Sequence, residues 1–197
     1  PLGPTHLAIE DVAILRALPQ MAIVAPADAA EMRRLMPATV GHRGPLYIRL
    51  AKGGDPVVTD TRGPFEIGKA VPMREGDDAL LLTTGVALQV ALEAAVLLQG
   101  RGLEAAILHM PTIKPFDADA LRRMAASVPV VVTVEEHSII GGLGSAAAEV
   151  LAEAALQPAR RFKRMGIPDV FPDRYGSQAG LMKRYGLCAE EVAATVL

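Results

Sequence analysis

Several residue types are scarce in this sequence, and each scarcity excludes a class of function. The 197 residues include one cysteine and no tryptophan, and aromatic residues make up only 4% of the chain. The single cysteine, Cys188, excludes an internal disulfide framework and a cysteine-based metal cluster, and it suits a reducing compartment. So few aromatic rings do not provide a stacking platform for nucleic-acid bases.

Neither positive nor negative charge is present in excess. Lys and Arg total 20 against 22 Asp and Glu, so the formal net charge is −2. Without an excess of cations there is no electrostatic case for binding nucleic acid or a membrane surface. No charge-free run of 18 apolar residues occurs either. We therefore expect a soluble, cytoplasmic protein, and the 51% of hydrophobic residues predicts a well-buried core.

The second half of the chain alternates apolar strands with helices. The continuous apolar run at 79–84 is typical of a strand covered on both faces, and residues 103–110 and 128–134 are predicted to be further buried strands. Helical segments lie between and after these runs, and residues 161–167 are a further candidate strand. This alternation predicts an α/β fold, with a doubly wound, mostly parallel sheet and helices on both faces.

The first 51 residues contain similar elements, but too few for a complete domain. A helix is predicted from about Thr5 to Leu18, and short strands are predicted over 22–25 and 46–50. Asp28 is placed to cap a second helix that begins near residue 27. Residues 52–66 are rich in Gly, Pro, Asp and Thr and have no apolar period, which indicates a linker.

His6 is the first candidate site residue. If the helix begins near Thr5, the imidazole projects from its first turn, beside unpaired backbone N–H groups and the positive end of the helix dipole. That position suits contact with an anionic or carbonyl oxygen, and Glu10, one turn later, could orient the ring. A capping or packing role is the alternative for a lone histidine.

Arg49 is the second candidate, because it stands alone inside an apolar strand. A buried guanidinium needs a partner, which is either a carboxylate or a bound phosphate. An ion pair is the commoner of the two, and the residues alone leave both open.

A third group follows the predicted strand over 128–134. Glu135, Glu136 and His137 come at its carboxyl end, where open α/β sheets place functional groups. They could equally form a subunit contact or a structural hydrogen-bond network. The Gly141–Gly144 loop then opens a helix and could receive a phosphate. Its spacing is not G-x-G-x-x-G, however, so close packing of helix on sheet is the alternative.

These segments lie in an order that is characteristic of one family. The stretches are GPTHLAIEDVAILRALPQMAIVAPADAAEM and GPLYIRL, followed by LLTTGVALQVALEAAVLLQGRG, ILHMPTIKPFDADAL and VVTVEEHSIIGGLGSAAAEVLAE. The first two resemble the end of the pyrimidine-binding domain of thiamine-diphosphate-dependent transketolases, and the others resemble the transketolase C-terminal domain. The resemblance implies an incomplete pyrimidine-binding domain over 1–51, a linker over 52–66 and a C-terminal domain over 67–197.

The resemblance implies transfer of a two-carbon ketol unit between sugar phosphates. The family's histidine in Gly-Pro-Thr-His lines the substrate channel and corresponds to His6, with a catalytic role. The arginine of the strand before the linker binds substrate phosphate and corresponds to Arg49. Leu2 stands where the family carries an aspartate that reads a substrate hydroxyl, which leaves the sugar open.

The resemblance also implies a cofactor and a partner. The complete enzyme uses thiamine diphosphate and Mg²⁺, but we expect no cofactor-binding or metal-binding residue within this chain. We expect it to be the C-terminal section or subunit of a transketolase, inactive alone, that joins an N-terminal section in a homodimer or heterotetramer. The alternatives are a section of a deoxyxylulose-phosphate synthase or dehydrogenase E1-β type enzyme, and a non-catalytic assembly or regulatory module.

Overall fold

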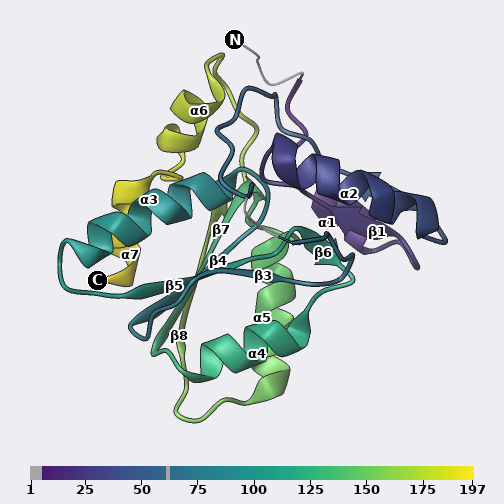
Figure 1. The fold of residues 1–197 in the computed structure, drawn as a ribbon. Coiled ribbons are helices and arrows are strands. Elements are labelled where there is room, and N and C mark those ends of the chain that lie inside the picture. The colour runs from purple at the N-terminus through teal and green to yellow at the C-terminus, as the bar shows by residue number, and fades with distance from the viewer. Residues whose placement is uncertain (1–5, 61–62) are drawn as a thin grey trace.

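The computed structural model describes residues 6–60 and 63–197, which form two sheets with helices packed around them (Figure 1). The strands are β1 Ala22–Val24, β2 Leu46–Ile48, β3 Val71–Arg74, β4 Ala79–Thr83, β5 Ala105–His109, β6 Thr112–Lys114, β7 Val130–Ser138 and β8 Arg161–Ile167. The helices are α1 Asp11–Arg16, α2 Ala29–Gly41, α3 Ala87–Gln99, α4 Ala118–Ala126, α5 Leu143–Ala154, α6 Gln178–Arg184 and α7 Ala189–Val196.

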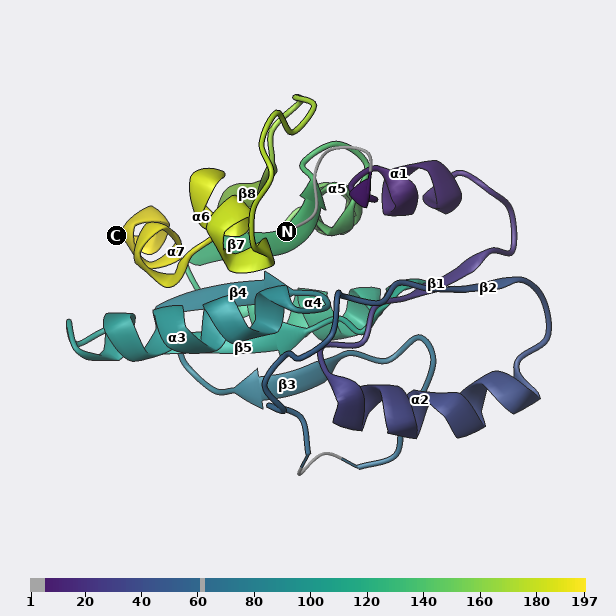
Figure 2. The same ribbon diagram turned by 90° about the horizontal axis from the view of Figure 1, so that it is seen from above.

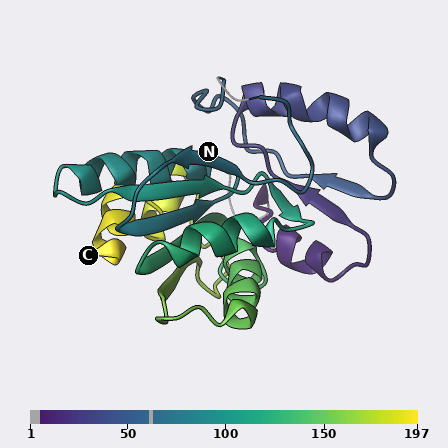
Figure 3. The ribbon, with the colours of Figure 1, turned by 60° about the horizontal axis from the view of Figure 1, so that its bottom comes forward.

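The larger sheet confirms the predicted doubly wound α/β architecture. Its strand order is β3-β5-β4-β7-β8, and all neighbours are parallel except β3, which is antiparallel at the edge. The central strand β4 is buried at every position, because α3 and α7 pack on one face of the sheet and α4 and α5 on the other (Figures 1 and 3). The sequence pattern did not indicate β3, whose partial exposure and Pro72 are typical of an edge strand.

The smaller sheet joins the N-terminal region to a strand from the middle of the sequence. Its order is β2-β1-β6, with β1 parallel to β2 and antiparallel to β6. Ile23 pairs with Lys114 and Val24 with Thr112. The third strand therefore comes from the segment that follows β5, so residues far apart in the chain complete the sheet (Figure 1), while Figure 2 shows β1 and β2 beside α2.

The helix predicted from Thr5 is wrong in its start, because α1 begins at Asp11. In a longer helix the N–H of Ala13 would donate to the carbonyl of Ile9, four residues earlier. Instead, Ile9 O accepts from the Ser138 N–H at 2.7 Å, and the Ala13 N–H donates to His137 Nε2 at 3.3 Å. The contact with β7 thus replaces the first helical bond. Leu2 and the Gly3–Thr5 stretch, which carry part of the sequence prediction, lie outside the described residues.

The structure confirms that Asp28 caps α2, and the same carboxylate also binds the segment around Thr59. Its Oδ1 accepts from the Glu31 N–H at 2.8 Å and from the Thr59 hydroxyl at 2.7 Å. Its Oδ2 accepts from the backbone N–H groups of Val58 and Thr59 at 2.7 and 2.8 Å. One buried carboxylate therefore fixes both the start of α2 and the segment that leads away from the smaller sheet.

We expect Asp28→Asn to lower the free energy of unfolding by about 1–3 kcal/mol at neutral pH, because an amide nitrogen cannot accept these donors. Burial on its own raises the pKa of Asp28, but the hydrogen bonds from Glu31, Thr59 and Val58 outweigh it and lower the pKa below 3.8. Since the folded-state pKa is the lower one, this stabilisation is present above about pH 4 and is lost as the pH falls through the folded value.

Urea denaturation of both proteins between about pH 2 and pH 7 measures this effect. The difference in the free energy of unfolding between the wild type and Asp28→Asn should become smaller at the acid end of this range. The control is Asp119→Asn, whose side chain is 81% exposed beside Arg122, and it should change stability little. If the loss of unfolding free energy in Asp28→Asn is the same at every pH, the ionised Asp28 carboxylate is not the source of the stabilisation.

Candidate functional site

A cavity of about 250 Å³ lies where the N-terminal segment, the end of β2 and the tail around α6 meet. Its polar lining comprises His6, Asp11, Tyr47, Arg49, Lys52, Glu136 and Gln178. Leu181, Met182 and Tyr185 form part of its apolar wall. The structure thus brings both sequence-predicted site residues, His6 and Arg49, to one cavity, and His6 precedes α1 instead of lying in its first turn.

Arg49 finds its partners among carboxylates and backbone carbonyls. Its Nε donates to Asp11 Oδ2 at 3.2 Å, and its Nη1 donates to Glu136 Oε2 at 3.2 Å. Its Nη2 donates to the carbonyls of Ala8 and Glu136 at 2.9 and 2.8 Å. Burial on its own would lower the pKa of Arg49, but the charges of Glu136 and Asp11 outweigh it and raise the pKa.

The described contacts of Arg49 use four of its five N–H groups. A guanidinium carries one N–H on Nε and two on each Nη, and the remaining one is on Nη1. This leaves Arg49 able to donate to one oxygen of a ligand in the cavity. Tyr47 adds to the same cluster, because its hydroxyl donates to Asp11 Oδ2 at 2.8 Å.

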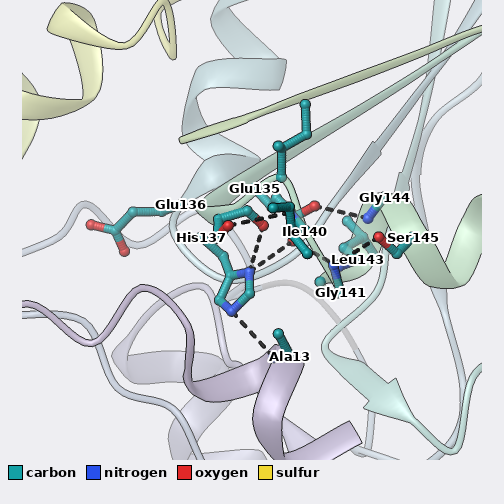
Figure 4. Close-up of polar contacts among 12 residues, drawn as sticks. Ala13, Glu135, Glu136, His137, Ile140, Gly141, Leu143, Gly144 and Ser145 are labelled. Atoms are coloured by element: carbon teal, nitrogen blue, oxygen red, sulfur yellow. Dashed lines mark hydrogen bonds and ion pairs between the residues drawn. The ribbon is translucent and has the colours of Figure 1, made fainter. Parts of the chain in front are cut away.

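The end of β7 carries the third group of predicted residues, and it points them to two sides. Glu136 faces the cavity, whereas Glu135 and His137 point the other way, toward α1 and α5 (Figure 4). This follows from the alternation of side chains along a strand. Of the three, only Glu136 lines the cavity.

His137 caps α1 from outside the helix. Neither Glu10, at the N-cap, nor any other side chain of the segment bonds the first turn, and His137 Nε2 accepts the otherwise unpaired N–H of Ala13 (Figure 4). Its Nδ1 faces the Ser138 carbonyl at 2.7 Å, which requires the proton on Nδ1. The ring is therefore neutral, and burial lowers the pKa of His137 accordingly.

Glu135 caps α5 in the same manner. Its carboxylate accepts from the N–H groups of Leu143 and Gly144 at 2.6 and 2.8 Å. Burial raises the pKa of Glu135 to about 7, and those two hydrogen bonds oppose the shift. The N–H groups that could have received a phosphate are therefore occupied, and the geometry of the Gly141–Gly144 loop accords with the packing alternative.

The glycines of this loop allow that close approach. A Cβ on Gly142 would lie 2.0 Å from Glu135 Oε2 and 2.6 Å from His137 Nδ1. Gly141, at φ +74°, would place a Cβ 2.7 Å from the Cβ of Ala13. The loop thus brings α1, β7 and α5 to within contact distance of one another.

Sequence reasoning missed Asp11, Lys52 and Gln178. Asp11 carries a signal in hindsight, since a strand arginine without a local partner requires a carboxylate elsewhere. Lys52 was assigned to the linker, and it lies on the cavity rim as an exposed cation. Gln178 carries no sequence signal, because a single glutamine before a short helix is ordinary surface composition.

Fold and site together define an α/β protein of the transketolase class, and the chain belongs to the transketolase family. Residues 68–192 match the model of the transketolase C-terminal domain, and residues 2–54 match that of the transketolase pyrimidine binding domain. This family depends on thiamine diphosphate.

Individual relatives are similar over almost the whole chain. A 6-deoxy-6-sulfo-D-fructose transketolase subunit from Clostridium sp. is 42% identical over 190 residues, which are 96% of this chain and 58% of that protein. A 1-deoxy-D-xylulose-5-phosphate synthase from Symbiobacterium thermophilum is 40% identical over 194 residues, 97% of this chain and 29% of that protein. A solved split gene transketolase, an inactive beta4 tetramer, has a TM-score of 0.90 at 40% identity, covering 98% of this chain and 62% of that one. The chain spans less than two thirds of each.

The residues described here do not fit the metal–diphosphate end of the family's cofactor. Within 6–60 and 63–197, no three His, Cys, Asp or Glu side chains gather as a metal site would require. The same residues include no helix long and apolar enough to cross a bilayer. The cavity is lined by hydrogen-bonding and charged side chains together with an apolar wall.

Gly142→Ala should lower the free energy of unfolding by about 2–4 kcal/mol, because the new methyl group must displace the buried Glu135 carboxylate from two N–H donors. Gly41→Ala is the matched control. A Cβ there has nothing within 4 Å, and alanine is the better helix former. Thermal denaturation of the two variants should shift in opposite directions. Equal melting temperatures would refute the capping role of Glu135.

Proposed function

We propose that this chain lines the substrate cavity of a thiamine-diphosphate-dependent transketolase of the cytoplasm. With an upstream section it would move a two-carbon ketol unit between sugar phosphates. The observation that supports this most is the single cavity that contains both His6 and Arg49. The proposal divides the chain into pyrimidine-binding residues 1–51, a linker over 52–66 and a C-terminal domain over 67–197.

Three of the cavity residues would act on the substrate. His6 donates a hydrogen bond to oxygens of the ketose substrate as negative charge develops on them. Such stabilisation of transition-state charge is usually the largest single contribution to catalysis. Arg49 binds substrate through its remaining N–H. The resemblance assigns Arg49 to phosphate, but Asp11 and Glu136 already face its charge, so the exposed Lys52 is the less encumbered cation for that group. The cofactor, when bound, supplies the carbon nucleophile of the reaction.

The relatives support an upstream partner. Two of them are a transketolase subunit and a split gene transketolase solved as an inactive beta4 tetramer. By analogy we propose that this chain is inactive alone and assembles with an N-terminal section or subunit as a homodimer or heterotetramer. The Mg²⁺ and diphosphate sites would then belong to that section.

A deoxyxylulose-phosphate synthase is the second candidate, favoured by the 40% identity to such an enzyme. The two reactions differ in their donor substrate. A product assay of the reconstituted enzyme with a ketose phosphate or with pyruvate as donor separates them. Turnover with pyruvate alone would replace the transketolase proposal.

Calorimetric titration of thiamine diphosphate and Mg²⁺ tests the division of the cofactor site. We expect no heat of binding with this chain alone and saturable binding once the upstream section is mixed in. The upstream section by itself is the control. Saturable binding to the isolated chain would mean that the cofactor site is wrongly placed.

His6→Ala, measured in the reconstituted enzyme, should lower kcat/KM by about 10²- to 10³-fold, because one positioned donor is lost from the transition state. His42→Ala is the control, since His42 is not among the residues that line the cavity. An unchanged rate for His6→Ala would favour a non-catalytic assembly or regulatory module.

A further inference from the structure

We propose that Glu136 is a specificity-determining residue: its carboxylate holds the place on Arg49 that the phosphate of a sugar phosphate takes, and the phosphate displaces it to reach the guanidinium. This inference rests on the proposed function, and it agrees with the phosphate-binding role that the family resemblance implies for Arg49. It adds a carboxylate from the region that matches the C-terminal domain to the determinants of substrate affinity.

Arg49 is anchored without the Glu136 side chain. Its Nε donates to Asp11 Oδ2 at 3.2 Å, and its Nη2 donates to the backbone carbonyls of Ala8 and Glu136 at 2.9 and 2.8 Å. These three contacts hold the plane of the guanidinium on one side. The arginine therefore stays in place when the carboxylate of Glu136 leaves it.

The carboxylate of Glu136 is held less firmly. Its Oε2 accepts from Arg49 Nη1 at 3.2 Å, which is longer than the roughly 2.7–2.9 Å typical of a charge-assisted hydrogen bond. Its Oε1 accepts from Gln178 Nε2 at 2.7 Å. The side chain lines the cavity and is 18% exposed. After it leaves Arg49, the carboxylate thus keeps one donor and remains within reach of solvent, so the displacement does not create an unpaired buried charge.

A phosphate and this carboxylate cannot share Nη1. Nη1 carries two N–H groups, of which one binds Glu136 and the other remains for a ligand. A phosphate on the second N–H would lie beside the carboxylate, and the two like charges would repel strongly because water screens these largely buried side chains weakly. Displacement of Glu136 gives both N–H groups to the phosphate, and Lys52 on the rim supplies a second cation.

The displacement affects charged and neutral ligands differently. A sugar hydroxyl or carbonyl oxygen can accept the remaining N–H while Glu136 stays on Arg49, because it brings no charge. Only a phosphate has to break the contact between Glu136 and Arg49. The affinity for a phosphate is therefore lowered by the cost of breaking that contact, whereas the affinity for a neutral sugar is independent of it.

Titration of inorganic phosphate into the ¹⁵N-labelled full chain, followed by NMR at the Arg49 Nε–H, tests the displacement without catalysis. Glu136→Gln removes the competing charge and should tighten phosphate binding by about 3- to 30-fold. Glu136→Asp keeps the charge but is one methylene group shorter, so its carboxylate is withdrawn from Arg49. Phosphate should therefore bind more tightly to this variant as well.

Asp173→Asn is the control for net charge. Asp173 follows Pro172 of the cavity wall, and its 61% exposed carboxylate pairs with Arg184 at 3.0 Å. Its replacement should change phosphate affinity by less than about two-fold. An unchanged affinity in Glu136→Gln, or no effect of phosphate on Arg49 in any of the proteins, would overturn the inference. Tighter binding in Glu136→Gln without tighter binding in Glu136→Asp would overturn the displacement, because the charge would then act at a distance.

Kinetics of the chain mixed with its upstream section test the consequence for the substrate. Glu136→Gln should lower the KM for D-fructose 6-phosphate by about 3- to 30-fold and leave the KM for unphosphorylated D-fructose unchanged. A loss of packing would impair both donors, so the difference between them separates the specificity role from a structural one. An equal change in both KM values would overturn the inference. If neither donor is turned over, the proposed function fails, while the phosphate titration still decides the role of Glu136.

Discussion

The capping of two helices by one strand end is the constraint on which the rest of this structure depends. β7 ends in Glu135, Glu136 and His137, and neither α1 nor α5 has a side-chain cap of its own. Glu135 supplies the cap of α5, and His137 supplies that of α1. Unpaired N–H groups at buried helix starts are costly. The N-terminal segment is therefore held on the larger sheet through the same residues that position Glu136 in the cavity.

The cavity is composite as a result. His6 and Arg49 come from the region that matches the pyrimidine binding domain, whereas Glu136 and Gln178 come from the region that matches the C-terminal domain. The arginine has two carboxylate partners, one from each region. The C-terminal region is thus a wall of the cavity and the source of a charge within it, in addition to whatever contacts it makes with other subunits.

The architecture could be predicted from the sequence because buried parallel strands are rich in apolar residues, and three of the five strands of the larger sheet, β4, β5 and β7, have this pattern or close to it. Arg49 could be recognised because an arginine in an apolar strand demands a partner. The identity of the partners could not be predicted, since Asp11 and Glu136 are distant from Arg49 in sequence and lie beside it only because α1 packs against the end of β7. The start of α1 was misplaced for the same reason: local propensity does not show that Ser138 and His137 take the hydrogen bonds of the first turn.

The pairing of β1 with β6 has a consequence for how the chain matures on the ribosome. β1 and β2 are synthesised early, but their sheet lacks its third strand until β5 and the segment after it have emerged. Domains commonly fold in the order of their synthesis, but β1 can pair with β6 only after the intervening chain has been made. The early strands must wait, with an open edge, for the later sheet to form and deliver their neighbour. A nascent chain that stalls before β6 would expose that edge to other unfolded chains.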